Sequence, residues 1–192
     1  KLGTASFTAG MLDEGTATLD SVQIAQTRER LGLNGSTGCG LDACTANANL
    51  LKANLAPSLA LLADVVRNPA FRDADIERMR AQWVAGIAQE KTQPVGLALR
   101  VLPPLVYGSG HPYAIPFSGS GVEADIKALT AADLRRWQAA WIRPDNVRIV
   151  VAGDTTLAEI TQQLDAVFGD WQAPAANKGS KAIPQVAAQA KP

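Results

Sequence analysis

The side chains that most often carry out catalysis are scarce in this sequence, and their spacing matches no known catalytic motif. The 192 residues contain a single histidine, His111, so this chain cannot build a metal site on two imidazoles. The patterns HExxH, HxxEH, CxxC, GxSxG and the P-loop do not occur. His111 lies in the segment Gly110-His111-Pro112-Tyr113, where proline stiffens a turn, and we expect its imidazole to bond to a nearby carbonyl group.

The two cysteines and the carboxylates give equally little sign of chemistry. Cys39 and Cys44 are too few for a disulfide scaffold, and they lack the second pair that a zinc site would need. They could bond if they faced each other across a hairpin; otherwise they are two small, half-buried side chains. The acidic residues fall at predicted helix ends, caps or faces, where solvated charge is expected: Asp13, Glu14, Glu77, Glu90, Glu123, Asp125 and Asp133.

The composition is that of a globular protein without a charge bias. Hydrophobic residues make up 47% of the chain and charged residues 19%, which excludes the disordered class. Lys+Arg and Asp+Glu both number 18, so the net charge gives no reason to expect nucleic acid or an anionic membrane as a partner. No apolar run approaches the ~20 residues that a membrane-spanning helix requires.

Helical periodicity, caps and turn residues predict a chain of helices with few strands. Small, β-tolerant residues on both sides of Gly40-Leu41-Asp42 predict a hairpin over 34–49, and a turn at Pro144-Asp145-Asn146 leads into a strand at 147–152. Pro103-Pro104 is expected to bend or break its helix. Helices are expected at 5–12, 21–31, 55–67, 73–90, 96–107, 131–141 and 157–168.

These elements favour an α+β fold, a two-layer sandwich with helices on one face of a mainly antiparallel sheet. About three strands are few for a sheet of this area, and strands upstream of Lys1 would complete it. After Trp171 the composition shifts to Ala, Pro, Lys, Gln and Gly. We therefore predict one domain at 1–171, lacking one or more N-terminal strands, and an Ala/Pro-rich interdomain linker at 172–192.

Several short phrases occur along the chain in a distinctive order. The first is Met11-Leu12-Asp13-Glu14-Gly15-Thr16, and the later ones are Gly110-His111-Pro112-Tyr113, Ile126-Lys127-Ala128-Leu129-Thr130 with Asp133-Leu134, Arg143-Pro144-Asp145-Asn146 and the run from Val147 to Gly153-Asp154. Their order over residues 1–171 resembles the M16 peptidase family, the group of pitrilysin, insulysin and mitochondrial processing peptidase. The resemblance implies a fold of the LuxS/MPP-like metallohydrolase type.

The resemblance also implies that the metal site of the family is missing from this chain. Active members carry HxxEH on the first helix, where two histidines bind zinc and the glutamate activates water, and a further ligand glutamate follows on a later helix. Alignment on Met11 places Ser6, Ala9 and Gly10 at the histidine and glutamate positions of HxxEH, and the later glutamate falls at or beside Gly86. None of the four can bind zinc usefully or move a proton as required, so we expect no catalytic residue, metal or cofactor here.

Many M16 proteins pair a zinc-bearing domain with similar domains that have lost the motif, and together these close around the substrate as a chamber. The resemblance therefore implies a non-catalytic domain that shapes this chamber and supports a zinc-bearing partner domain, in the same polypeptide or in a partner subunit. Zinc is expected only in that partner, and the parent protein would be a zinc metalloendopeptidase although this chain alone is inactive. The alternative is a stand-alone, non-proteolytic assembly or peptide-binding domain of the same fold.

The resemblance further suggests where a peptide would bind. In active relatives an edge strand near the metal pairs with the substrate backbone, a mode that reads main chain rather than side chains. The matching segment here is Asp42-Ala43-Cys44-Thr45, similar to the family's NA.T phrase. We expect extended peptide as a partner at these residues, unless they merely belong to the hairpin. The family also suggests the bacterial periplasm or cell envelope as the compartment.

Overall fold

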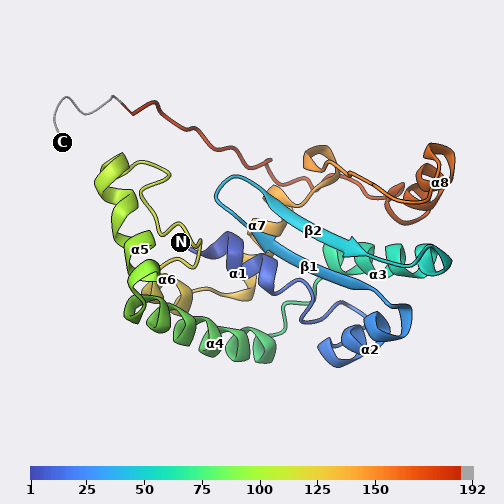
Figure 1. The fold of residues 1–192 in the computed structure, drawn as a ribbon, viewed down its shortest axis with the longest axis horizontal. Coiled ribbons are helices and arrows are strands. Elements are labelled where there is room, and N and C mark those ends of the chain that lie inside the picture. The colour runs from blue at the N-terminus through green and yellow to red at the C-terminus, as the bar shows by residue number, and fades with distance from the viewer. Residues whose placement is uncertain (187–192) are drawn as a thin grey trace.

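Residues 1–186 of the chain are described by a computed structural model in which helices dominate (Figure 1). The helices are α1 (Thr4–Gly10), α2 (Ser21–Leu31), α3 (Leu55–Arg67), α4 (Asp73–Thr92), α5 (Pro94–Tyr107), α6 (Glu123–Lys127), α7 (Ala131–Trp141) and α8 (Leu157–Phe168); the strands are β1 (Asn34–Cys39) and β2 (Cys44–Asn49). The helices expected near these positions are confirmed, and the short α6 is an addition. The last six residues of the predicted linker lie outside the described residues.

Local signals explain why the helices begin where they do. At the start of α2 the Asp20 carboxylate accepts a hydrogen bond from the amide of Gln23 at 2.8 Å, and the Gln23 side chain accepts one from the amide of Asp20 at 2.9 Å. Thr130 and Asp133 form the same reciprocal box at the start of α7. Both caps satisfy amides that have no partner inside the helix, so these two boundaries follow from the sequence.

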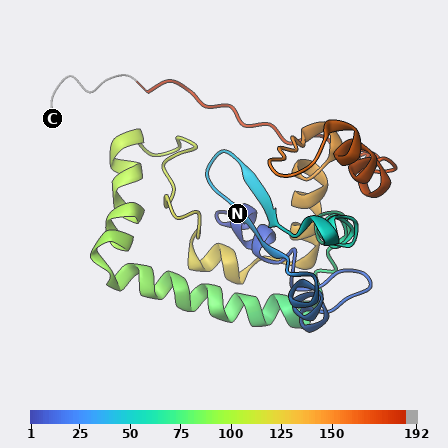
Figure 2. The same cartoon turned by 45° about the vertical axis from the view of Figure 1, so that its right-hand side comes forward.

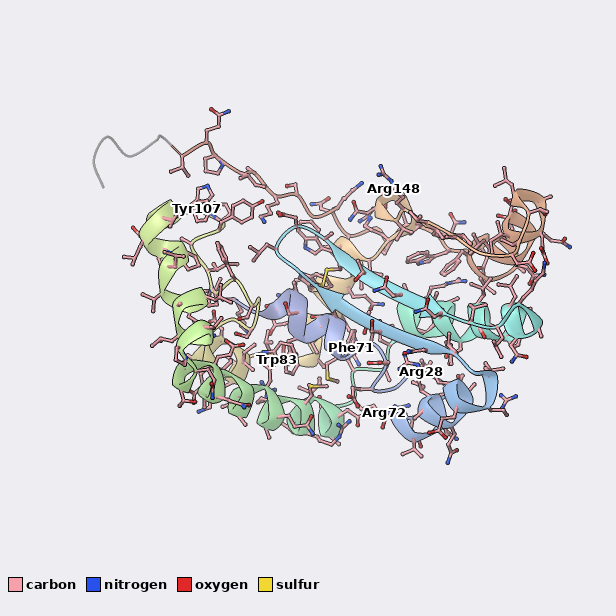
Figure 3. All side chains as sticks on the ribbon, viewed as in Figure 1. Arg28, Phe71, Arg72, Trp83, Tyr107 and Arg148 are labelled. Atoms are coloured by element: carbon pink, nitrogen blue, oxygen red, sulfur yellow. A yellow bond between two sulfur atoms is a disulfide. The ribbon has the colours of Figure 1, made fainter. Side chains whose placement is uncertain are left out.

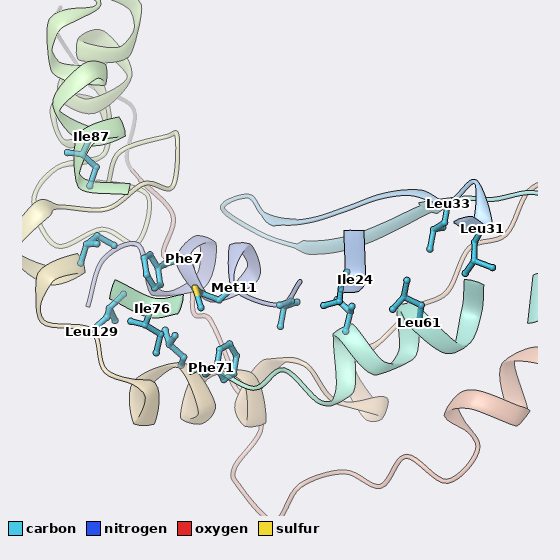
Figure 4. Close-up of a cluster of buried hydrophobic side chains, with 14 residues drawn as sticks. Phe7, Met11, Ile24, Leu31, Leu33, Leu61, Phe71, Ile76, Ile87 and Leu129 are labelled. Carbon is cyan, nitrogen blue, oxygen red and sulfur yellow. The ribbon is translucent and has the colours of Figure 1, made fainter. Parts of the chain in front are cut away.

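The two strands form an antiparallel hairpin that covers the main hydrophobic cluster. Its register runs from Asn34 opposite Asn49 to Cys39 opposite Cys44. Helix α1 packs along β1 and α3 against β2, and Figure 4 shows the buried side chains gathered on one side of the hairpin. Helices on one face of an antiparallel sheet confirm the predicted α+β class. The cluster consists of Phe7, Met11, Leu12, Ile24, Leu31, Leu33, Leu61, Val65, Phe71, Ile76, Ile87, Ile126, Leu129 and Leu134.

Helix α5 leaves α4 at a sharp corner and stands as a separate arm (Figure 2). The corner is tight because a Cβ at Gly96 would lie 2.6 Å from the carbonyl oxygen of Glu90. Arg100, whose side chain is only 9% exposed, closes it by donating to the carboxylate of Glu90 at 2.7 Å, to the hydroxyl of Ser120 at 2.8 Å and to the carbonyl of Gly121 at 2.7 Å. One buried guanidinium thus joins α4, α5 and the loop before α6.

The break that we expected at Pro103-Pro104 is wrong, because α5 continues to Tyr107. Pro103 has no N–H to donate to the carbonyl of Leu99, which would normally be left without a partner. The amide of Phe117 donates to that carbonyl at 3.0 Å instead, so the loop after α5 supplies the missing hydrogen bond. Although α5 is apolar, none of the helices in residues 1–186 combines the length and the apolarity that crossing a membrane requires.

The strand that we expected at 147–152 is also wrong. Within residues 1–186 this run pairs with no strand, since the sheet of the described chain contains β1 and β2 alone. Its apolar side chains are exposed, up to 85% for Val150. A strand persists only where a neighbour satisfies its N–H and C=O groups. The sequence pattern therefore identified a run that favours a strand, but not a partner for it.

Residues 172–186 form neither helix nor strand, as their composition predicts. They run from the end of α8 past the turn of the β1–β2 hairpin, in both Figure 1 and Figure 2. Part of this run, residues 176–184, makes specific contacts with the body of the chain and is called the C-terminal strap below. The division into a domain at 1–171 and a linker remains a prediction.

Candidate functional site

Three of the four positions at which the family resemblance predicts lost metal chemistry lie on α1, and two of them, Ser6 and Ala9, hold it against the hairpin. The Ser6 hydroxyl donates to the carbonyl oxygen of Cys39 at 3.2 Å. Gly119 lies against the same hydroxyl, so closely that a Cβ on it would lie 2.6 Å from Ser6 Oγ and 3.7 Å from the carbonyl oxygen of Cys39. Ala9 is buried, and its carbonyl accepts a hydrogen bond from the Thr37 hydroxyl at 2.7 Å. Small side chains at these positions let α1 pack closely on its neighbours.

An indole ring covers the third position, Gly10. A Cβ at Gly10 would lie 3.4 Å from Cζ3 of Trp83, in van der Waals contact. The same ring packs edge-to-face on Phe7, with 5.5 Å between ring centroids, and its Nε1 donates to the carbonyl of Ser120 at 2.9 Å. Figure 3 shows Trp83 between α4 and α1. Aromatic packing therefore occupies the space beside the position where the family carries its second histidine.

The fourth position, Gly86, lies one turn beyond Trp83 on α4 and is exposed. No atom would come within 4 Å of a Cβ there, so Gly86 contributes nothing toward α1. Together the four positions offer one hydroxyl, one methyl group and two hydrogens, which do not fit Zn²⁺ because it binds imidazole, thiolate or carboxylate. In residues 1–186 no three His, Cys, Asp or Glu side chains gather as metal ligands do. We derive no metal-dependent step from this chain.

The isolated chain is expected to hold well below one zinc ion per molecule, because it lacks the donor groups of a zinc site. Metal analysis of protein purified without a histidine tag measures this, and a zinc-bearing M16 enzyme purified in parallel provides the positive control. One tightly held zinc per chain, with ligands at coordination distance, would contradict the reading of Ser6, Ala9, Gly10 and Gly86.

His111 has a structural role, as predicted from its turn. The amide of Tyr113 donates to Nδ1 of His111 at 3.0 Å, which leaves Nε2 as the protonated nitrogen. Nε2 lies 3.0 Å from the carbonyl oxygen of Pro184 and donates to it. The ring also stacks on Tyr107, with 5.0 Å between centroids. Both nitrogens of the only histidine are therefore occupied by backbone groups, and neither is free to act as a base.

The segment Asp42–Thr45, predicted to contact peptide, lies at the hairpin turn and the start of β2. The amide of Gly40 donates to the carbonyl of Ala43 at 2.9 Å, which closes the turn. Gly40 and Ala43 thus form a hydrogen-bonded pair, and hydrogen-bonded and non-hydrogen-bonded pairs alternate along an antiparallel ladder. Cys44 and Ala46 therefore belong to non-hydrogen-bonded pairs, and their N–H and C=O groups point away from β1. No strand in residues 1–186 pairs with that edge of β2. Main-chain groups for strand addition are therefore available there.

The side chain of Asp42 binds two groups of the chain itself. It accepts a hydrogen bond from the Tyr113 hydroxyl at 2.6 Å and one from the Lys181 ammonium at 3.0 Å. The hydrogen bond from Tyr113 and, to a smaller extent, the one from Lys181 hold the pKa of Asp42 below its ordinary value. The hydrogen bond between Tyr113 and Asp42 also raises the pKa of Tyr113. Sequence reasoning missed Lys181, because a lysine in an Ala/Pro-rich run carries no signal of its own partner.

Cys39 and Cys44 are joined by a disulfide, which decides the alternative that the sequence left open. They are opposite each other at the last position of the register, and Figure 3 shows the sulfur–sulfur bond at the end of the hairpin. The bond closes a ring of six residues around the turn 40–43. The hairpin tip is thus covalently fixed.

Comparisons with known proteins identify the family of this chain. The model of the family described as insulinase (peptidase family M16) matches residues 1–104, and the model described as the peptidase M16 inactive domain matches residues 128–192. A solved peptidase M16 inactive domain from Pseudomonas fluorescens is 31% identical, with a TM-score of 0.85 over 96% of this chain and 44% of that one.

Two curated relatives are more distant. An uncharacterized zinc protease of Rickettsia bellii is 23% identical, and the non-peptidase homolog YmxG of Helicobacter pylori is 21% identical, each over 86% of this chain. The chain spans only 40% and 38% of the length of these two proteins. The first family model alone matches more than half of the chain, and the second extends the match to its end. The chain therefore belongs to peptidase family M16, as a domain of the inactive type.

Proposed function

We propose that this chain is a non-catalytic domain of an M16-type zinc metallopeptidase, where it shapes the peptide chamber and supports a zinc-bearing partner domain. The observation that carries the proposal is the lack of metal-binding side chains at positions that pack instead: Ser6 bonds the carbonyl of Cys39 and lies against Gly119, and the ring of Trp83 lies beside Gly10. The chain has the fold of the family, and the residues at the positions predicted for the metal ligands on α1 make packing contacts instead. The chain spans less than half of the length of these relatives, which supports the proposal of a partner domain in the same polypeptide or in a second subunit.

The full-length gene product provides the test. We expect an HxxEH motif in the remainder of the polypeptide or in a partner subunit, one zinc bound there, and cleavage of extended peptides. Replacing the glutamate of that motif should abolish cleavage and leave the complex assembled, because the metal-activated water would be lost. Cleavage that persists in this variant, or zinc that maps to residues 1–192, would contradict the proposal.

The similarity to YmxG of Helicobacter pylori, which is named a non-peptidase homolog, favours a second candidate function. In that case the chain belongs to an assembly or peptide-binding protein of the same fold that does not cut peptides. An intact gene product without HxxEH in any of its domains or subunits, and without peptidase activity, would decide for this alternative.

We also propose that the free edge of β2 contacts extended peptide by strand addition at Asp42–Thr45 and the residues that follow. Support comes from the outward N–H and C=O groups of Cys44 and Ala46 and from the exposure of both residues.

The disulfide supports the bacterial periplasm or cell envelope as the compartment, since structural disulfides persist in oxidising surroundings.

In the full-length protein, Ala46→Pro is expected to raise the KM for extended peptides about fivefold. Proline removes the outward N–H of Ala46 and with it one main-chain hydrogen bond, worth about 1 kcal/mol. Cys44 is unsuitable for this test, because its replacement would also break the disulfide. Peptide cleavage measured over a range of substrate concentrations gives the result.

Ala46→Gly is the matched control, because it alters the side chain and keeps the N–H. It should leave KM near the parent value. If Ala46→Pro folds and its KM equals that of Ala46→Gly, the edge of β2 does not contact substrate and the role of the domain is structural.

A further inference from the structure

The C-terminal strap, residues 176–184, is attached to the body of the chain along its first half, through Lys181, and at Pro184, whose carbonyl accepts a hydrogen bond from Nε2 of His111 at 3.0 Å. The first half of the strap lies on the end of α7. The buried guanidinium of Arg143 donates to the carbonyl of Ala176 at 2.6 Å, and the amide of Gly179 donates to the carbonyl of Ala140 at 2.8 Å. Gly179 touches the ring of Trp141, since a Cβ on it would lie 2.3 Å from Cε2 of that ring. Lys178 adds a hydrogen bond to the carbonyl of Asp145 at 2.7 Å.

The second half is attached to the hairpin tip through the ammonium group of Lys181. This group donates to the carbonyl of Leu41 at 2.8 Å and to the carboxylate of Asp42 at 3.0 Å. It also lies over the ring of Tyr113, 4.2 Å from the centroid. A carbonyl, a carboxylate and an aromatic face together form a seat for one ammonium group, called the lysine seat below.

The lysine seat depends on the shape of the turn. Leu41 and Asp42 both lie inside the ring that the Cys39–Cys44 disulfide closes. The seat needs the carbonyl of Leu41 and the carboxylate of Asp42 on the same side of the turn, at hydrogen-bond distance from one nitrogen. A closed ring of six residues restricts these relative positions far more than an open turn does. The contacts of Arg143 and Gly179 on α7 involve no residue of this ring.

We propose that the Cys39–Cys44 disulfide is a redox-sensitive latch that holds the second half of the C-terminal strap on the hairpin tip. Reduction by a dithiol breaks the Sγ–Sγ bond: two electrons and two protons pass to the cysteines, which become thiols, and the dithiol becomes a disulfide. The opened turn no longer presents Leu41 and Asp42 together, so Lys181 leaves the lysine seat. The first half of the strap remains on α7, and the face of Tyr113 and the carboxylate of Asp42 become open to solvent.

Acetylation of lysine amines in the intact chain, followed by mass spectrometry, measures this release. Reduction with a phosphine, which carries neither amine nor thiol, is expected to make Lys181 react about tenfold faster, the factor that loss of one charge-assisted contact implies. Lys178 and the exposed Lys127 should keep their rates in the same sample. A chain with Cys39→Ser and Cys44→Ser should give the same pattern without any reductant.

Asp42→Asn is the variant that tests the seat itself, because it removes the charge and leaves the disulfide in place. Lys181 should react several-fold faster in the oxidised variant, and Asp154→Asn, a change at an exposed carboxylate paired with Lys52, should have no effect. Unchanged reactivity of Lys181 on reduction, or in Asp42→Asn, overturns the proposal. Equal acceleration of Lys178 and Lys181 with loss of the near-ultraviolet circular dichroism overturns it too, since the disulfide would then hold the fold rather than the strap.

Discussion

Replacing Phe7 by alanine is expected to lower the free energy of unfolding by about 3–5 kcal/mol, the usual cost of truncating a fully buried aromatic side chain. Phe7 is 0% exposed and packs edge-to-face on Trp83. Its removal leaves a cavity between α1 and α4 that neither helix can close, because hydrogen bonds from Thr37 and Trp83 fix α1 and the indole. Guanidinium unfolding followed by circular dichroism measures the change.

Val22→Ala is the control for this prediction. Val22 lies on α2 and is 61% exposed, so its truncation should change the unfolding free energy by no more than about 0.5 kcal/mol. A cost below about 1 kcal/mol for Phe7→Ala would show that Phe7 is not central to the core.

Replacing Arg100 by methionine is expected to destabilise the chain by about 3 kcal/mol, because breaking a buried ion pair leaves its partner without compensation. The guanidinium makes three contacts, to Glu90, Ser120 and Gly121. Methionine keeps the apolar stem, but the carboxylate of Glu90, whose side chain is 26% exposed, then keeps only the hydroxyls of Ser118 and Ser120 as protein hydrogen-bond partners. The same unfolding measurement applies.

Arg136→Met is the matched control, since Arg136 pairs with Asp133 at the surface and its side chain is 74% exposed. Exposed pairs contribute about 0–1 kcal/mol, so the control should remain close to the parent chain. Equal losses for Arg100→Met and Arg136→Met would mean that the network of Arg100 does not hold the α4–α5 corner.

Much of the fold could be predicted because its signals are local. The reciprocal cap of Thr130 and Asp133, and the turn at Gly40-Leu41-Asp42, depend on neighbours within a few residues. The two wrong predictions concern segments whose structure depends on residues far away in the sequence. The run 147–152 favours a strand, yet a strand also needs a second strand beside it, and Pro103 is tolerated in α5 because the amide of Phe117 bonds the carbonyl of Leu99.

In the candidate site, too, local features could be predicted from the sequence and contacts between distant residues could not. Residue types alone show that Ala9 and Gly10 carry no donor group whatever surrounds them, while their equivalence to the family's metal ligands remains a prediction. That Trp83 covers Gly10 could not be predicted, because α1 and α4 are far apart in the sequence and meet only in the folded chain. Lys181 was missed for the same reason: its seat is 140 residues away at Leu41.

The close packing around α1 also has an evolutionary consequence. An imidazole at position 6 would meet Gly119, which already lies against the small hydroxymethyl group of Ser6, and one at position 10 would share its surroundings with the indole of Trp83, which the Cβ alone would already touch. Regaining a metal site would therefore require the loop at Gly119 to move before any new ligand brought a benefit. Each intermediate would lose core packing and gain no activity, so selection is not expected to lead from this packing to a zinc site by single substitutions.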